Sequence, residues 1–202
     1  MRGISMGGFV TLSITLALVG SAAMPAADVW RVGKAADYPN QTGNQITIGA
    51  KPLSSEADTE PVFGKKADFN KYGILPVLVV IENRRSKTLD LRDLEVTLVG
   101  RKGQHVDPLK PDEVAYIALP AQRPSNVKLP FPTAKKKNPL AVPELTGRAF
   151  VSKLVPPGDS ASGFFYFEAQ AEPGMKLYVN NLREQPSGEE ILYFEFPITE
   201  QQ

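Results

Sequence analysis

The chain contains few of the side chains that usually catalyse reactions or bind transition metals. It has no cysteine and one histidine, His105, which follows a predicted turn at residues 100–103. A cupredoxin-type copper site needs a thiolate and two imidazoles, and a structural zinc site needs several Cys or His ligands. A nucleophilic triad would depend on His105, and no Gly-x-Ser-x-Gly motif is present. We therefore expect no cofactor, no metal site and a lone surface histidine.

Carboxylates are numerous, with 22 Asp and Glu residues, so a pair suited to hydrolysis is not excluded by counting. The adjacent pairs Asp112–Glu113 and Glu189–Glu190 both lie beside predicted turns, where solvated charge is ordinary. Residues 90–93 lack the ligand spacing of an EF-hand, and no glycine-rich nucleotide-binding motif is present. We expect the protein not to be an enzyme, with a hydrolase that uses loop carboxylates as the alternative.

Residues 120–143 are rich in proline and basic side chains and contain no acid. Proline fixes φ and removes a backbone donor, so this segment is predicted to be a loop that leaves the sheet. Each lysine near an anionic membrane contributes about 1 kcal/mol, so the loop would give weak contact with an anionic surface or a partner. A solvated loop with no such role is the alternative. The candidate contact residues are Arg123, Lys128, Lys135, Lys136 and Lys137.

Four consecutive aromatic residues follow the Pro/Gly turn in the sequence VPPGDSASGFFYFE, residues 155–168. Phe165 and Phe167 fall on one face of the predicted strand. Most rings in the last third of the chain share their parity with Leu and Ile, and burying each would stabilise the fold by roughly 1.5–3 kcal/mol. The opposite parity supplies a candidate exposed patch, unless the amino-terminal arm or the proline-rich loop covers it. These candidate residues are Phe164, Tyr166, Tyr178 and Tyr193.

The elements that would position these residues are short strands. Residues 74–83 (ILPVLVVIEN) are apolar on both parities, which predicts a strand buried on both faces. Residues 52–71 are predicted to be a long connection, and residues 145–155 fit either a helix or a strand, with a strand favoured. The other predicted strands are residues 45–50, 94–99, 114–119, 163–168, 176–182 and 190–198.

About seven short strands separated by Pro/Gly turns, without a convincing amphipathic helix, predict an all-β antiparallel sandwich. The runs ILPVLVVIEN, LEVTLVG, VPPGDSASGFFYFE, KLYVNNL and EILYFEFPI resemble bacterial extracytoplasmic immunoglobulin-like domains. The resemblance covers about residues 45–198 and implies an immunoglobulin-like β-sandwich outside the cytoplasm, but no reaction. The sequence departs from the antibody-type pattern, because it lacks a Cys pair and its only Trp, Trp30, precedes the first predicted strand.

The amino-terminal residues are typical of a secretory signal peptide. Arg2 precedes an apolar run at residues 9–19 and small residues at 20–23, and the run is shorter than the roughly 20 residues that span a bilayer. We expect cleavage after Ala23, or after Ala27 at the latest. The predicted domains are then a loose arm at residues 24–43 and an immunoglobulin-like sandwich at residues 44–200.

Removal of the signal peptide takes away Arg2, so Lys+Arg falls from 23 to 22 and equals the 22 acidic residues. A net charge of zero gives no bulk attraction to nucleic acid, and no membrane-spanning segment is expected after cleavage. We predict a non-catalytic binding or interaction module in the periplasm or outside the cell, with an unknown protein or envelope component as partner. The alternatives are the hydrolase above and a structural or assembly component of the envelope.

Overall fold

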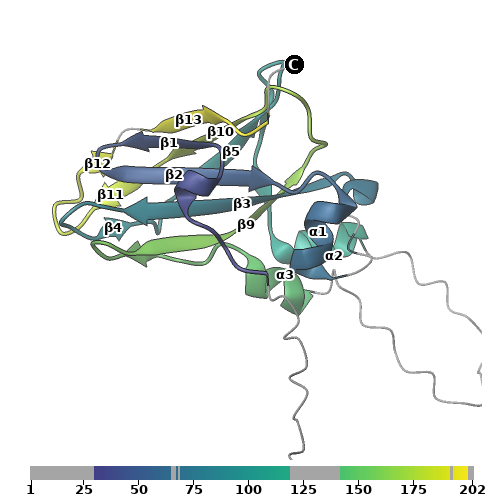
Figure 1. Ribbon diagram of the computed structural model, residues 1–202, viewed down its shortest axis with the longest axis horizontal. Helices are drawn as coiled ribbons and strands as arrows, with labels where there is room; N and C mark the ends of the chain where they lie inside the picture. Colours follow the sequence, from purple (N-terminus) through teal and green to yellow (C-terminus); the bar gives the residue numbers. More distant parts are fainter. Residues whose placement is uncertain (1–29, 65–66, 68, 119–141, 192, 200–202) are drawn as a thin grey trace, which may run out of the picture.

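The computed structural model describes residues 30–64, 67, 69–118, 142–191 and 193–199. Within these residues the chain forms three antiparallel β-sheets and three short α-helices (Figure 1). The predicted β-rich class is confirmed, and the helices are an addition to it. The predicted signal peptide and residues 119–141 of the proline-rich region lie outside the described residues.

Sheet A is the largest sheet, with strand order β1-β2-β3-β9-β7. Its central strand is β3, which has the bounds predicted from the sequence and pairs with β2 on one side and β9 on the other. The β-branched residues of β3 favour an extended backbone. The strands of sheet A are β1 (Asn40–Gly43), β2 (Ile46–Pro52), β3 (Ile74–Asn83), β7 (Pro108–Leu109) and β9 (Ser160–Glu168).

Sheets B and C together face sheet A. The strand order is β13-β10-β5-β6 in sheet C and β12-β11-β4-β8 in sheet B. Asn181, with a φ of 59°, separates β10 from β11, so the chain bends there as it passes from sheet C to sheet B. The strands are β4 (Leu89–Asp90), β5 (Glu95–Val99), β6 (His105–Val106), β8 (Leu154–Val155), β10 (Lys176–Asn180), β11 (Leu182–Glu184), β12 (Glu190–Ile191) and β13 (Phe194–Pro197).

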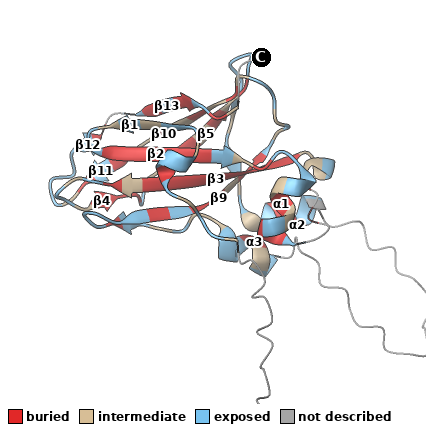
Figure 2. Ribbon diagram, viewed as in Figure 1, coloured by how far each residue is buried: buried red, intermediate tan, exposed pale blue. Residues whose placement is uncertain are grey.

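A first hydrophobic core fills the space between sheet A and sheets B and C. Alternate residues of β3, from Leu75 to Ile81, meet Leu177 and Val179 of β10 in this core. Phe167 is fully buried in it and Phe165 packs at its margin, which confirms the predicted parity of these two rings. Figure 2 shows that β2 and β3 are buried along almost all of their length.

A second core covers the other face of sheet A, where Leu78 and Val80 of β3 point toward the helices. The helices gather over one end of the sheet (Figure 1). The helices are α1 (Glu56–Phe63), α2 (Pro111–Ala118) and α3 (Val142–Arg148), with 3-10 turns at Ala35–Asp37 (η1) and Asn70–Tyr72 (η2). The described part of the molecule therefore has three layers, namely helices, sheet A, and sheets B and C.

Two sequence predictions are wrong where the helices cover sheet A, and a third, for residues 145–155, is right only in part. Residues 114–119 were predicted to be a strand, but residues 111–118 form α2, which buries Val114. The long connection at 52–71 contains α1, whose N-cap Ser55 accepts a hydrogen bond from Asp58 N. The ambiguous segment 145–155 divides, because α3 continues to Arg148 and only residues 154–155 pair as β8.

The described part of the predicted amino-terminal arm packs against sheet A rather than lying loose. Asn40–Gly43 form β1, and Ala35 of η1 is fully buried. Ala35 N donates to Glu82 Oε1 of β3 over 2.8 Å. A Cβ on Gly49 of β2 would lie 2.2 Å from Ala35 O, so glycine is needed at position 49 for this close approach.

Candidate functional site

The residues singled out from the sequence are not brought together by the structure. The basic residues Arg123, Lys128, Lys135, Lys136 and Lys137 all lie outside the described residues. His105 is exposed in β6. Asp112 and Glu113 are exposed at the start of α2, and Glu189 and Glu190 are exposed where β12 begins. In the described part of the chain, no group of three or more His, Asp or Glu side chains is placed to hold a metal ion.

The predicted exposed aromatic patch is partly wrong. Phe164 is 3% exposed and Tyr166 is 1% exposed, because both rings belong to the second core. Trp30 lies against Phe164, and Tyr166 Oη donates to Leu145 O of α3 over 2.9 Å. Burial raises the pKa of Tyr166 above its ordinary range. These two rings hold the arm and the helices to sheet A and present no binding surface.

Tyr178 and Tyr193 lie away from the second core, on the outer face of sheet C. Tyr193 is 56% exposed, and the centroids of the two rings are 5.2 Å apart. The planes of the two rings are inclined by 33°, so they do not form one flat platform for a sugar or a base. Their place beside Lys176 and Glu195, which form an exposed ion pair, is that of cross-strand surface contacts.

A polar cluster that the sequence analysis did not identify lies where four chain connections meet. We name this region the loop end, and it comprises Asn83, Glu184 and the connections at residues 44–45, 84–88, 156–159 and 185–189. Asn83, the last residue of β3, is 1% exposed at its centre. Its Nδ2 lies within hydrogen-bond distance of Lys87 O at 2.9 Å, Val155 O at 2.9 Å and Pro156 O at 3.1 Å.

Asn83 also positions the connection that follows it. Its Oδ1 accepts from Arg85 N over 3.0 Å, and its backbone O accepts from Gly158 N over 2.8 Å. Arg84 N donates to Gln45 O, so the β1–β2 turn is also joined to the connection that follows β3. A buried amide that uses both its donor and its acceptor atoms in this way fixes one arrangement of the loops.

Glu184, the last residue of β11, is the buried acid of the loop end, with a side chain only 4% exposed. Its carboxylate accepts from Lys87 Nζ and from the Arg85 guanidinium. Arg85 Nη1 also donates to Asn44 O over 3.2 Å. The hydrogen bonds from Lys87 and Arg85 lower the pKa of Glu184, so this group is ionised at neutral pH.

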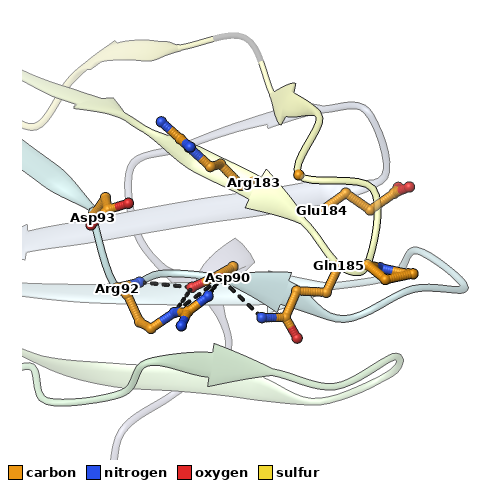
Figure 3. Close-up of a pocket in the computed structure, with 8 residues that line it drawn as sticks. Asp90, Arg92, Asp93, Arg183, Glu184 and Gln185 are labelled. Atoms are coloured by element: carbon orange, nitrogen blue, oxygen red, sulfur yellow. Dashed lines mark hydrogen bonds and ion pairs between the residues drawn. The ribbon is translucent and has the colours of Figure 1, made fainter.

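Asp90 forms a second paired charge on the sheet beside Glu184. Figure 3 shows the Arg92 guanidinium folded over the Asp90 carboxylate, with Gln185 Nε2 donating to Asp90 Oδ2 over 2.9 Å. The hydrogen bond from Arg92 holds the pKa of Asp90 far below its usual range. Asp90 and Glu184 are therefore fixed negative charges, each already bound to cations of the same chain.

A shallow polar depression of about 370 Å³ lies over these pairs. Arg183, from β11, lines it, and its guanidinium points away from Asp90 in Figure 3. Arg183 is exposed, and we find no ion pair to it among the described residues. A second depression of about 240 Å³ on the other side of Glu184 is lined by Asn44, Gln45, Arg85 and Ser86. Glu184 lines both depressions, the first together with the 185–189 connection and the second together with the 44–45 and 84–88 connections.

The fold and this region define a mostly β, cysteine-free protein with a polar loop end. No protein-family model matches the chain, and no curated protein matches it. Among solved structures, the chain is similar to a crystal structure from Bacillus subtilis described as a "putative lipoprotein (ycdA)", with 10% sequence identity and a TM-score of 0.39. The match covers 80% of this chain and 39% of that chain, and a similarity of this extent carries no argument about function. No described helix is long and apolar enough to cross a membrane.

Proposed function

We propose that the protein is a non-catalytic extracytoplasmic binding module, built on a variant of the immunoglobulin-like β-sandwich, that recognises a protein or envelope partner through its loop end. The observation that carries this proposal is the locking of four connections around Asn83 and Glu184 into one exposed surface. The antiparallel pairing of all three sheets and the core shared between the two facing layers support the sandwich. The compartment follows from the predicted signal peptide.

A locked loop surface suits recognition because binding then orders little of the protein. Each side chain that must be immobilised on association costs about 0.5–1.5 kcal/mol, and loops that are fixed beforehand avoid much of this cost. Arg183 supplies an exposed guanidinium beside these loops, a group common among the residues that dominate interface energies. The loop end therefore combines a fixed shape with an accessible cation.

The hydrolase alternative has less support from the same residues. A carboxylate pair that cleaves glycosidic bonds needs one carboxyl group whose pKa is raised, so that it carries a proton near neutral pH. The pKa values of Asp90 and Glu184 are shifted in the opposite direction by their cations. Assembly by strand addition, the remaining alternative, is favoured by a different observation, the unpaired edge of β5.

The proposal is tested by site-specific cross-linking in the native envelope. A photo-reactive amino acid at Ser86, which borders the second depression, is expected to cross-link to one defined protein partner. Arg183→Ala should reduce that product by about fivefold or more, as for an arginine at an interface, without lowering the melting temperature. The secreted protein should begin at residue 24 or 28 when its amino terminus is sequenced.

Two matched controls make this experiment decisive. Arg101→Ala removes an exposed arginine from the turn between β5 and β6, and the same cross-linker at Gln170 reports on the connection between β9 and β10. Neither residue belongs to the loop end. Equal cross-linking from Ser86 and Gln170, or equal losses in Arg183→Ala and Arg101→Ala, would overturn recognition by the loop end.

A further inference from the structure

One side of the facing sheets leaves a strand edge without a partner. Strand β5 pairs with β10 through all five of its residues, but β6 covers only Leu98 and Val99 on the other edge. Gly100 N donates to Gln104 O across this hairpin over 2.9 Å. Because backbone groups alternate in direction along an antiparallel strand, those of Leu98 and Val96 point to the same side as those of Gly100.

Val96 is therefore the residue whose N–H and C=O face outward beyond the end of β6. In the described part of the chain, no backbone or side-chain hydrogen bond reaches these two groups from outside the sheet. The preceding N–H, that of Leu94, is already used by Leu91 O over 3.2 Å. The open edge is thus short, and it offers one donor and one acceptor to an added strand.

A depression of about 410 Å³ runs along this edge. Four consecutive residues of β5 and its approach, residues 94–97, line it, as do Asp107, Pro108 and Phe165. Residues of both parities lining one hollow place that hollow beside the strand rather than over one face of the sheet. Phe165 forms an apolar wall of the depression, and its ring is stacked on that of Phe150, with the two centroids 5.3 Å apart.

The polar side chains at this depression set its charge. Glu95 and Asp107 are both exposed, and no basic residue is among those that line it. Val96 is buried on the inner face of β5, whereas Glu95 and Thr97 lie on the outer face. A strand added beside β5 would therefore place alternate side chains against Phe165 and Leu94 on one face and against Glu95 on the other.

We propose that the edge of β5 binds an extended segment of a partner protein by strand addition, and that the segment alternates apolar with basic residues. The backbone of Val96 supplies the hydrogen bonds, and Phe165 and Leu94 receive the apolar side chains. Glu95 and Asp107 attract the basic side chains. This site is separate from the loop end, so either binding activity can fail without the other.

The probe is a short synthetic peptide of alternating valine and lysine, titrated against the full chain and followed by NMR. We expect saturable binding with slowed hydrogen exchange at Val96. Glu95→Lys replaces cross-strand attraction with repulsion and should weaken binding by about tenfold or more. Glu189→Lys makes the same charge change at the exposed β11–β12 connection and should leave the affinity unchanged, as should Arg183→Ala.

Two altered peptides separate strand addition from simple attraction of charge. A peptide methylated on the backbone nitrogens that would face β5 keeps its charge but loses its donors, and it should not bind. A valine–glutamate peptide should bind Glu95→Lys more tightly than it binds the unaltered protein. Equal binding of the methylated peptide, no binding of the valine–lysine peptide, or self-association of the protein through this edge would overturn the proposal.

Discussion

The loop end and the open edge of β5 differ in where their polar groups find partners. At the loop end, the amide of Asn83 and the carboxylate of Glu184 are bonded to residues of the 84–88 and 156–159 connections. At the open edge, the N–H and C=O of Val96 have no hydrogen-bond partner among the described residues. In the first region the polar groups already have partners within the chain, so a binding partner meets a fixed surface. In the second region, backbone groups at a sheet edge are available to pair with an added strand. They suit different kinds of recognition.

The opposite side of the same two layers shows how the chain closes an edge. There β1 of sheet A lies beside β13 of sheet C, and Glu195 N donates to Gln41 Oε1 over 2.7 Å. A side-chain amide thus takes the place of a missing strand. Uncovered edges invite pairing with other chains, and proteins commonly protect them. On the other side, β7 of sheet A contacts β5 but does not pair with it, so the Val96 N–H and C=O of that edge stay without a partner among the described residues.

The largest loss of stability is expected from Asn83→Ala, which removes the buried amide at the centre of the loop end. The change removes the side-chain hydrogen bonds of Asn83 to Lys87 O, Val155 O, Pro156 O and Arg85 N, and losing this set should cost about 3 kcal/mol in total. The melting temperature should fall by roughly 6–12 °C for a domain of this size. Differential scanning calorimetry measures the change.

Asn180→Ala is the matched control for Asn83→Ala. Its buried Oδ1 has no hydrogen-bond partner in the described structure, so its removal breaks no bond to that atom. The expected loss is less than about 1 kcal/mol. If the two variants lose equal stability, the bonds made by Asn83 do not hold the loop end together.

The free energy of unfolding is expected to fall by about 2 kcal/mol in Gly163→Ala, which displaces the chain segment that packs on Phe165 beside the β5 edge. A Cβ at position 163 would lie 2.4 Å from Phe150 Cα, so the segment that stacks on Phe165 must move. Gly147→Ala is the control, because a Cβ there has nothing within 4 Å and alanine favours the helix. Chemical denaturation should show Gly163→Ala destabilised and Gly147→Ala unchanged or slightly stabilised.

A smaller loss, and one that depends on pH, is expected from Glu184→Gln. The folded-state pKa of Glu184 is lowered, so its ionised form stabilises the fold above the ordinary carboxyl pKa of about 4.3. That contribution declines as the pH falls from there through the lowered value. The difference in melting temperature between the two proteins should therefore be largest at neutral pH and shrink toward pH 3 or so. A difference that grew on acidification would contradict the pairing with Lys87 and Arg85.

The helices could have been predicted from the sequence, because helix start signals precede segments that were interpreted by their strand-like alternation. Residues 114–119 alternate well enough for a strand, but Pro111 and the acids Asp112 and Glu113 precede them. Proline at the first helical position and acids in the first turn are start signals for a helix. Pro143 and Glu144 provide a similar signal in the first turn of α3, and Ser55 caps α1. Tertiary burial of Val114 and Leu145 then stabilises these short helices.

The burial of Phe164 and Tyr166 could have been inferred from the predicted burial of β3 on both of its faces. A strand that is apolar on both faces needs cover on both, and β9 is hydrogen-bonded beside it along its length. The cover of β3 therefore extends over the second face of β9. The loop end could not be predicted from the sequence, because Arg85 and Glu184 are 99 residues apart and no local pattern joins them. Only the three-dimensional register brings these charges together.

The smallest loss of stability is expected from Gln41→Ala, which removes the side-chain contact between β1 and β13. The Glu195 N–H is exposed to water once Gln41 is truncated, so the loss should be only about 0.5 kcal/mol. Hydrogen exchange at Glu195 should accelerate while exchange at Val96 stays the same, and Gln170→Ala should change neither. Acceleration at both amides would mean that the two edges respond together, whereas acceleration at Glu195 alone establishes that each side of the sheets is closed, or left open, by its own residues.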